Sequence, residues 1–472
     1  MSSGQVYQKA RAAWIAGVAD NATYRKAQLF VLHNGLQRNA ARLIEALSDD
    51  IGWGKELAIA ACNVVLRALR SIHESLSLES DLHTERAISK GGSSEHRNLS
   101  VGVTLILGST VNPLLSLLLP LVGSLAAGNS SILILPEKCN AVNRFVADLL
   151  RDTVDHEVVQ LLPTQMISSL TGHRYDTVAL GPRDSQLVLE RFKQLSPTTH
   201  FLQPVSGQAV AIVDRSADLH SAATYLHHAV ATSPAASLQG RPRVCFVNEF
   251  VLTSLAGRLV ACWASKHVPL SDKPSALPST ESILISASGQ TTVKKQLCHP
   301  VSAAGIIAAL QTVDKTSLLL IPTTSNTHAI DLLNAIHENE LAPVLYAFSA
   351  SPEGSFFSRF ARAQATFINT IPSSALVSWF PQTPNETISV PYSPSDFAVN
   401  HPVFQDQPLK ASQGLSRAVL DSTRLKPPTR KPRLGFTFFE KGIFLGLGEF
   451  LVTVGVVVYG GTKVWRMVNG QL

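Results

Sequence analysis

The stretch that decides the fold covers residues 101–137 and reads VGVTLILGSTVNPLLSLLLPLVGSLAAGNSSILILPE, without a charged side chain before Glu137. A run of this kind must be buried, either in a membrane or in a protein core. A membrane span needs about 20 unbroken apolar residues. This run is interrupted at Asn112-Pro113, at Pro120 and at Gly128-Asn129. The interruptions favour a protein core.

The interrupted run predicts a strand, a loop, a helix and a second strand. Residues 103–107 and 132–135 are short aliphatic runs, as expected for strands that are covered by helices on both faces. Between them, Pro120 can open a helix as its first residue and Gly128 can close it. The sequence therefore predicts a β-α-β unit.

This unit resembles the first β-α-β of the nucleotide domain of aldehyde dehydrogenases, particularly the branch that acts on fatty aldehydes. In that family a G-x-W-N-Y-P-like turn is followed by a helix that reads P-L-x-G-A-x-A-A-G-N. Here residues 108–113 read GSTVNP and residues 120–129 read PLVGSLAAGN. The resemblance covers roughly residues 8–395 and is patchy between 268 and 316.

The resemblance implies an α/β fold with a Rossmann-type nucleotide domain, an α/β catalytic domain and a homodimeric assembly. We expect four segments: residues 1–205 for N-terminal helices and the nucleotide domain, 206–392 for a catalytic-type domain with oligomerisation elements, 393–439 for a Pro/Ser-rich basic linker, and 440–463 for a transmembrane tail anchor.

The C-terminal segment 442–461, GIFLGLGEFLVTVGVVVYGG, predicts a single membrane span. Its eleven Ile, Leu, Phe and Val residues favour insertion by about 5 kcal/mol, against a cost of about 3 kcal/mol for Glu449. The alternative is an interfacial or buried helix. Basic residues concentrate before the span, so the large domain is expected in the cytosol, on a membrane such as the endoplasmic reticulum.

The distribution of charge and of cysteines argues against nucleic-acid-binding proteins and zinc proteins. The net charge is +6, and five of the basic residues lie within 424–433, RLKPPTRKPR, which leaves the rest of the chain near neutrality and without a nucleic-acid surface. The five cysteines show no C-x-x-C spacing, which indicates a reducing compartment and no zinc site.

Aldehyde oxidation in this family requires a thiolate, an amide that stabilises the oxyanion, and a carboxylate base. The family's oxyanion asparagine falls on Val111, with Asn112 one residue away. The base falls on Pro204. The nucleophile falls on Leu238 or Gln239, where there is no cysteine. The resemblance thus implies a scaffold without the family's chemistry.

The family's dinucleotide-binding positions are replaced as well. The ribose-binding lysine of K-P-S-E falls on Leu135, and E-x-F-G-P places Val313 and Lys315 at its acid and aromatic positions. Of the phosphate-side T-G-S-x-x-V-G only Gly181 is kept. We therefore expect no cofactor, or NAD or NADP if the chain is active.

Cys245 is the one candidate nucleophile, and it requires a shift of about six residues in the alignment. Counting back from Glu249, which matches the family's V-H-E, again gives Gln239. Cys245 also lies in the apolar run 244–247, where a thiol commonly packs as a small apolar group.

Metal chemistry and other enzyme classes find no support in the sequence. No HExxH, GxxxxGK[ST] or G-x-S-x-G motif occurs. The adjacent pair His227-His228 cannot chelate as histidines four residues apart on a helix would, which favours a packing or surface role and predicts no metal site.

The sequence leads to two hypotheses. The first is a tail-anchored pseudoenzyme in a lipid or secondary-metabolite pathway that acts through a membrane-bound enzyme or a lipophilic ligand in the former substrate tunnel. The second is an active NAD(P)-dependent oxidoreductase that oxidises a lipophilic aldehyde to the carboxylic acid, using Cys245 in an altered register.

Overall fold

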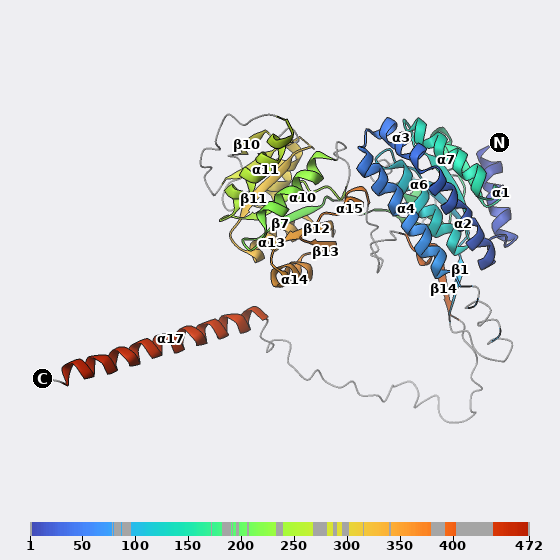
Figure 1. The fold of residues 1–472 in the computed structure, drawn as a ribbon. Helices are drawn as coiled ribbons and strands as arrows, with labels where there is room; N and C mark the ends of the chain where they lie inside the picture. Colours follow the sequence, from blue (N-terminus) through green and yellow to red (C-terminus); the bar gives the residue numbers. More distant parts are fainter. Residues whose placement is uncertain are drawn as a thin grey trace, which may run out of the picture. The chain divides into compact units, whose positions relative to one another are not determined.

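The computed structural model describes most of the chain in separate stretches. These are residues 2–77, 79, 86, 96–170, 172–181, 190, 192–194, 198–204, 207–232, 239–267, 281–286, 290–294, 302–314, 316–338, 341–378, 392–402 and 438–470. They belong to two compact units, Met1–Phe404 and Gln405–Leu472. The first unit holds the five-stranded and seven-stranded sheets, and the second is described as one helix (Figure 1).

Four helices open the first unit, within the segment 1–205 for which N-terminal helices are expected. They are α1 (Ser3–Ile15), α2 (Ala22–Arg38), α3 (Ala40–Ile51) and α4 (Lys55–Ser75). Ser2 and Asn21 cap the first two by accepting hydrogen bonds from main-chain N–H groups of the first turn. The apolar sides of α2, α3 and α4 are buried in the largest hydrophobic core.

A five-stranded parallel sheet follows, in the order β4-β3-β2-β5-β6. Its strands are β2 (Val103–Leu107), β3 (Ser130–Leu135), β4 (Val159–Pro163), β5 (Thr177–Leu180) and β6 (His200–Leu202). Helices α6 (Pro113–Ala127) and α7 (Asn140–Thr153) connect them, with η1 (Thr164–Met166) and α8 (Ile167–Leu170) after β4. Every residue of β2 is buried, which confirms the predicted β-α-β unit with helices on both faces.

The start of α6 differs from the prediction. Asn112 caps the helix and Pro113 is its first residue, so Pro120 lies inside the helix rather than at its beginning. Pro113 is suited to the first position because that residue needs no hydrogen-bonded N–H. Gly128 ends the helix with a φ of 89°, as predicted.

The second sheet has seven strands in the order β10-β9-β11-β8-β7-β12-β13. Its strands are β7 (Val210–Val213), β8 (Val244–Asn248), β9 (Ser282–Ile285), β10 (Thr291–Lys294), β11 (Leu318–Thr323), β12 (Ala342–Phe348) and β13 (Ala363–Ile368). Helices α10 (Leu219–Ala231) and α11 (Leu252–His267) pack in the same hydrophobic core as one face of this sheet. Helices α12 (Ala303–Thr312), α13 (Asn326–Ile336) and α14 (Ser351–Phe360) lie on the other.

The chain then returns to the N-terminal helices. Helix α15 (Ser373–Val377) packs on α4, η2 (Pro394–Phe397) packs on α6, and β14 (Ala398–Pro402) pairs antiparallel with β1 (His96–Ser100). The linker predicted from residue 393 therefore begins with an ordered segment. Phe397 fills the space beside Gly123, where a Cβ would lie 2.6 Å from the Phe397 ring.

Helix α17 (Phe438–Asn469) occupies the position of the predicted tail anchor. Large apolar side chains along it are exposed, among them Leu445, Phe450, Val452 and Trp465. In the part of the chain that the structure describes, no helix combines the length and the hydropathy needed to cross a membrane.

Candidate functional site

The segment where the family carries its nucleophile is held by main-chain contacts. The carbonyl of Gln239 accepts a hydrogen bond from the N–H of Ala209 at 2.9 Å, and that of Gly240 accepts one from the Tyr346 hydroxyl at 2.7 Å. At Gly240 a Cβ would lie 1.8 Å from the carbonyl oxygen of Ala375 in α15. The main chain after Gln239 is thus pressed against α15, and Leu238 lies outside the described residues.

Cys245 lies in the middle of β8, paired with Ala211 of β7 and Leu320 of β11. Its side chain is fully buried, and burial raises the pKa of the thiol. Only the thiolate is a good nucleophile, and an apolar environment without a cation disfavours it. In this position Cys245 packs as a small apolar residue.

The oxyanion position offers no side-chain donor. Val111 is apolar and buried. The neighbouring amide of Asn112 is used within the fold, because its Nδ2 donates to the carbonyl of Val377 at 2.9 Å and its Oδ1 accepts from the N–H of Leu115 at 3.1 Å. Asn112 therefore caps α6 and fastens it to α15.

The carboxyl ends of β2 and β5 meet at the point where strand order reverses, which is where open α/β sheets bind nucleotides. A pyrophosphate can approach the main chain closely only if there is free space at the carboxyl ends of these two strands. Here Ser109 fills it, since a Cβ at Gly181 would lie 2.4 Å from the Ser109 Cβ. The Ser109 N–H donates to the Ser116 hydroxyl at 2.9 Å, which fixes the turn.

The remaining dinucleotide positions do not suit the family's cofactor either. Leu135 is a half-buried apolar residue at the end of β3, and it cannot bond a ribose hydroxyl through its side chain. Val313 is buried at the end of α12. Lys315 and residues 182–189 lie outside the described residues, and Pro204, at the base position, has no group that titrates. The described positions thus do not fit NAD or NADP as the family holds it.

The adjacent histidines have separate environments. His227 is buried edge-on against Trp263, with ring centroids 4.6 Å apart. The Nε2 of His228 lies 3.0 Å from the Oε1 of Glu56 in α4, and Glu56 also accepts a hydrogen bond from Ser373. One histidine packs and the other lies at the surface. Among the described residues, no group of three or more metal-ligating side chains occurs.

Sequence reasoning missed the role of α15. No motif marks the contact between Gly240 and Ala375, or the one between Asn112 and Val377, because both join positions far apart in the chain. The only signal in the sequence is the glycine itself, directly after Gln239.

Sequence similarity to known proteins is confined to the N-terminal half of the chain in the family match. Residues 4–235 match the aldehyde dehydrogenase family. This match covers slightly less than half of the chain, so its N-terminal part is similar to aldehyde dehydrogenases. Aldehyde dehydrogenase family 3 member B1 from Homo sapiens is 32% identical over 209 residues, or 42% of this chain and 44% of that protein. The Rattus norvegicus protein of the same name is 32% identical over 181 residues, or 36% and 38%. The aldehyde-dehydrogenase-like chain thus matches less than half the length of these relatives.

Solved aldehyde dehydrogenases share the fold over most of the chain. AldH from Staphylococcus aureus, solved in a substrate-bound state, gives a TM-score of 0.63 at 16% identity and covers 87% of this chain and 95% of its own. An NAD-dependent aldehyde dehydrogenase from Sinorhizobium meliloti gives 0.63 at 14%, covering 86% and 88%. The aldehyde-dehydrogenase-like fold therefore continues beyond residue 235, where the family match ends.

Proposed function

We propose that this chain is an aldehyde-dehydrogenase-like pseudoenzyme attached to a membrane. The observation that carries the proposal is the replacement of the family's chemistry at the described positions. Gln239 stands where the family has its thiol, Val111 stands where it has the amide donor, and Pro204 stands where it has the carboxylate base. Burial of Cys245 within β8 removes the one cysteine that could replace the nucleophile.

Membrane attachment through α17 is supported by its exposed apolar side chains. Leu445 is 74% exposed and Val452 is 67% exposed, which is unfavourable for a helix surrounded by water. The basic run 424–433 precedes this helix and suits an anionic cytosolic membrane surface. We place the chain on a cytosol-facing membrane such as the endoplasmic reticulum, in a lipid or secondary-metabolite pathway.

The partners follow from the same reasoning. A membrane-bound enzyme, or a lipophilic ligand held in the former substrate tunnel, would make use of a scaffold that no longer turns over substrate. Self-association as a homodimer is supported by strand edges that have no neighbouring strand among the described residues. These are the edge of β13, which lies beside the exposed Phe360 and Ile368, and the edges of the two-stranded β1–β14 sheet. Unpaired sheet edges of this kind are suited to strand addition.

A cofactor titration of the full chain tests the loss of chemistry. We expect tryptophan fluorescence to show no saturable micromolar binding of NAD or NADP, and we expect no NADH formation with a long-chain aldehyde. The alternative is an active oxidoreductase, consistent with the names of the relatives. It requires aldehyde-dependent NADH formation that Cys245→Ala abolishes and Cys262→Ala retains, and that result would overturn the pseudoenzyme proposal.

Membrane attachment is tested by fractionation. The full chain should sediment with membranes, and deletion of residues 438–472 should release it into the soluble fraction. Resistance to alkaline carbonate would indicate a span, whereas release by carbonate would indicate interfacial binding. A full chain that stays in the soluble fraction would contradict attachment.

A further inference from the structure

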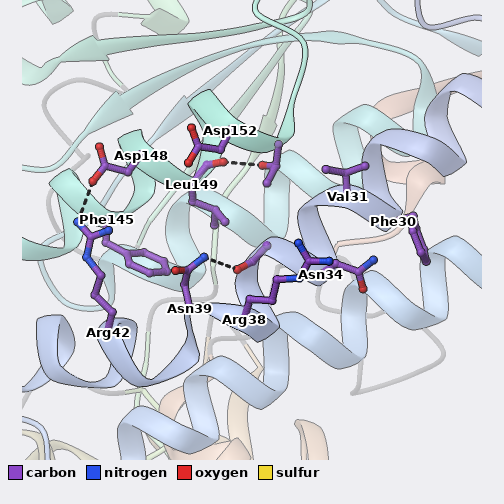
Figure 2. A pocket seen from close by; sticks show the side chains of 12 residues that line it. Phe30, Val31, Asn34, Arg38, Asn39, Arg42, Phe145, Asp148, Leu149 and Asp152 are labelled. Atoms are coloured by element: carbon purple, nitrogen blue, oxygen red, sulfur yellow. Dashed lines mark hydrogen bonds and ion pairs between the residues drawn. The ribbon is translucent and has the colours of Figure 1, made fainter.

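A surface pocket of about 400 Å³ lies where α2, the start of α3 and α7 meet (Figure 2). The close approach of the helices depends on Gly35, where a Cβ would lie 2.5 Å from the Thr153 Cγ2 and 3.0 Å from the Leu149 Cδ1. Phe145 and Leu149 are buried and form an apolar floor. The pocket includes none of the positions that carry the family's chemistry.

The charges around this pocket are only partly neutralised within the chain. Arg42 and Asp148 form an ion pair at 2.8 Å, and the hydrogen bond from Arg42 lowers the pKa of Asp148 (Figure 2). By contrast, the side chains of Arg38 on α2 and Asp152 on α7 form no hydrogen bond or ion pair with another residue that the structure describes. An available cation and an available anion therefore line the same pocket from different helices.

Apolar and amide side chains complete the lining. Phe30 and Val31 stand at one end of the pocket and are 56% and 43% exposed. Asn34 lies between them and Arg38 on α2, and its amide also has no partner among the described residues. Exposed large apolar groups next to unpaired charges of both signs indicate a ligand that is itself amphipathic and zwitterionic.

We propose that this pocket binds the zwitterionic headgroup of a membrane phospholipid. The phosphate would lie at Arg38 and Asn34, because a guanidinium group suits phosphate oxygens. The ammonium group would lie at Asp152, and the adjoining glycerol backbone would cover Phe30 and Val31. A simple anion fits less well, since Asp148 and Asp152 would repel it.

The choice of a lipid as the source of the headgroup rests on the membrane attachment proposed above. Binding to the pocket can nevertheless be measured without a membrane. Glycerophosphocholine carries the headgroup and no acyl chain, so isothermal titration calorimetry with the full chain in a non-ionic detergent tests the pocket independently of α17. A failure of attachment would instead appear in the fractionation of the truncated chain.

We expect saturable binding of glycerophosphocholine that weakens about tenfold in Arg38→Gln and in Asp152→Asn, because each variant removes one charge-assisted contact. Arg67→Gln and Asp49→Asn are matched controls on exposed positions outside the pocket, and they should bind as the unmodified chain does. Circular dichroism of each variant verifies folding.

Three results would overturn the proposal. The first is the absence of binding in a folded chain. The second is equal affinity in the pocket variants and in their controls. The third is inorganic phosphate binding as tightly as glycerophosphocholine without any effect of Asp152→Asn, which would make this an anion site. The chain should float with phosphatidylcholine vesicles more than with vesicles of a glycolipid that lacks phosphate. If Arg38→Gln removes this difference, the result would support the lipid as the natural source.

Discussion

The side-chain amide of Asn112 donates a hydrogen bond to the main-chain carbonyl of Val377, with 2.9 Å between Nδ2 and the oxygen. This bond joins the N-terminus of α6 to the end of α15 and is fully buried at Asn112. An amide next to the family's oxyanion position is therefore committed to holding the fold together.

Substitution of Asn112 by alanine should lower the free energy of unfolding by about 2–3 kcal/mol. It removes a helix cap and leaves the Val377 carbonyl without its donor. Urea denaturation followed by circular dichroism measures the change. Asn63→Ala, at an exposed position of α4, should have little effect, and equal losses in both variants would contradict the role of Asn112.

Gly240→Ala should destabilise the chain by about 3 kcal/mol or prevent folding, because the added methyl group would overlap the Ala375 carbonyl. Gly257→Ala on α11 is the matched control, since a Cβ there meets no atom within 4 Å. That control should stabilise the helix by about 0.5–1 kcal/mol. Thermal unfolding of both variants decides the point, and a stable Gly240→Ala protein would show that α15 does not press on this segment.

Cys245 should resist a maleimide reagent in the native chain and react after denaturation, whereas the partly exposed Cys262 should react earlier. Peptide mass spectrometry assigns the labelled residue. Rapid native labelling of Cys245 would argue for a reactive thiol.

The same burial predicts a pH dependence of stability. The pKa of Cys245 is raised in the folded state, so its contribution is present below the unfolded pKa of about 8.5 and is lost as the pH rises above it. The urea concentration at the unfolding midpoint should therefore decrease as the pH rises above this value. The decrease should be less steep in Cys245→Ala. Parallel pH profiles in the two proteins would contradict this assignment.

Phe397→Ala should cost about 3–5 kcal/mol, since the ring is fully buried against α6. Val399→Ala, at a side chain that is 58% exposed on β14, should cost little. Gly123→Ala should be strongly destabilising alone and nearly harmless in the Phe397→Ala background, because the clashing ring is then absent. Additive losses in the double variant would show that the two residues do not touch.

Local sequence signals predicted much of the first sheet. The charge-free run gave β2 with its observed bounds and the C-terminus of α6 at Gly128, because burial on both faces and a left-handed glycine leave clear marks in a sequence. The error at Pro120 arose because two prolines compete for the same role, and the cap at Asn112 decides between them.

The candidate site was harder to predict, because its decisive contacts are not local. The sequence shows that Gln239 is not a cysteine, but it does not show that Gly240 meets α15 or that Ser109 fills the space beside Gly181. The return of residues 392–402 to α6 and β1 was also not predicted. Its Pro- and Ser-rich composition resembles a linker, and its partners lie about 270 to 300 residues earlier in the chain.

The packing of Gly240 against Ala375 would make the proposed loss of activity difficult to reverse. A cysteine introduced at Gln239 would lie next to a main chain that packs tightly against α15. The amide of Asn112 would still be bonded to the Val377 carbonyl and not free to bind an oxyanion. Introducing aldehyde dehydrogenase activity would require redesign of that short helix together with the segment around Gly240. No single substitution could accomplish it.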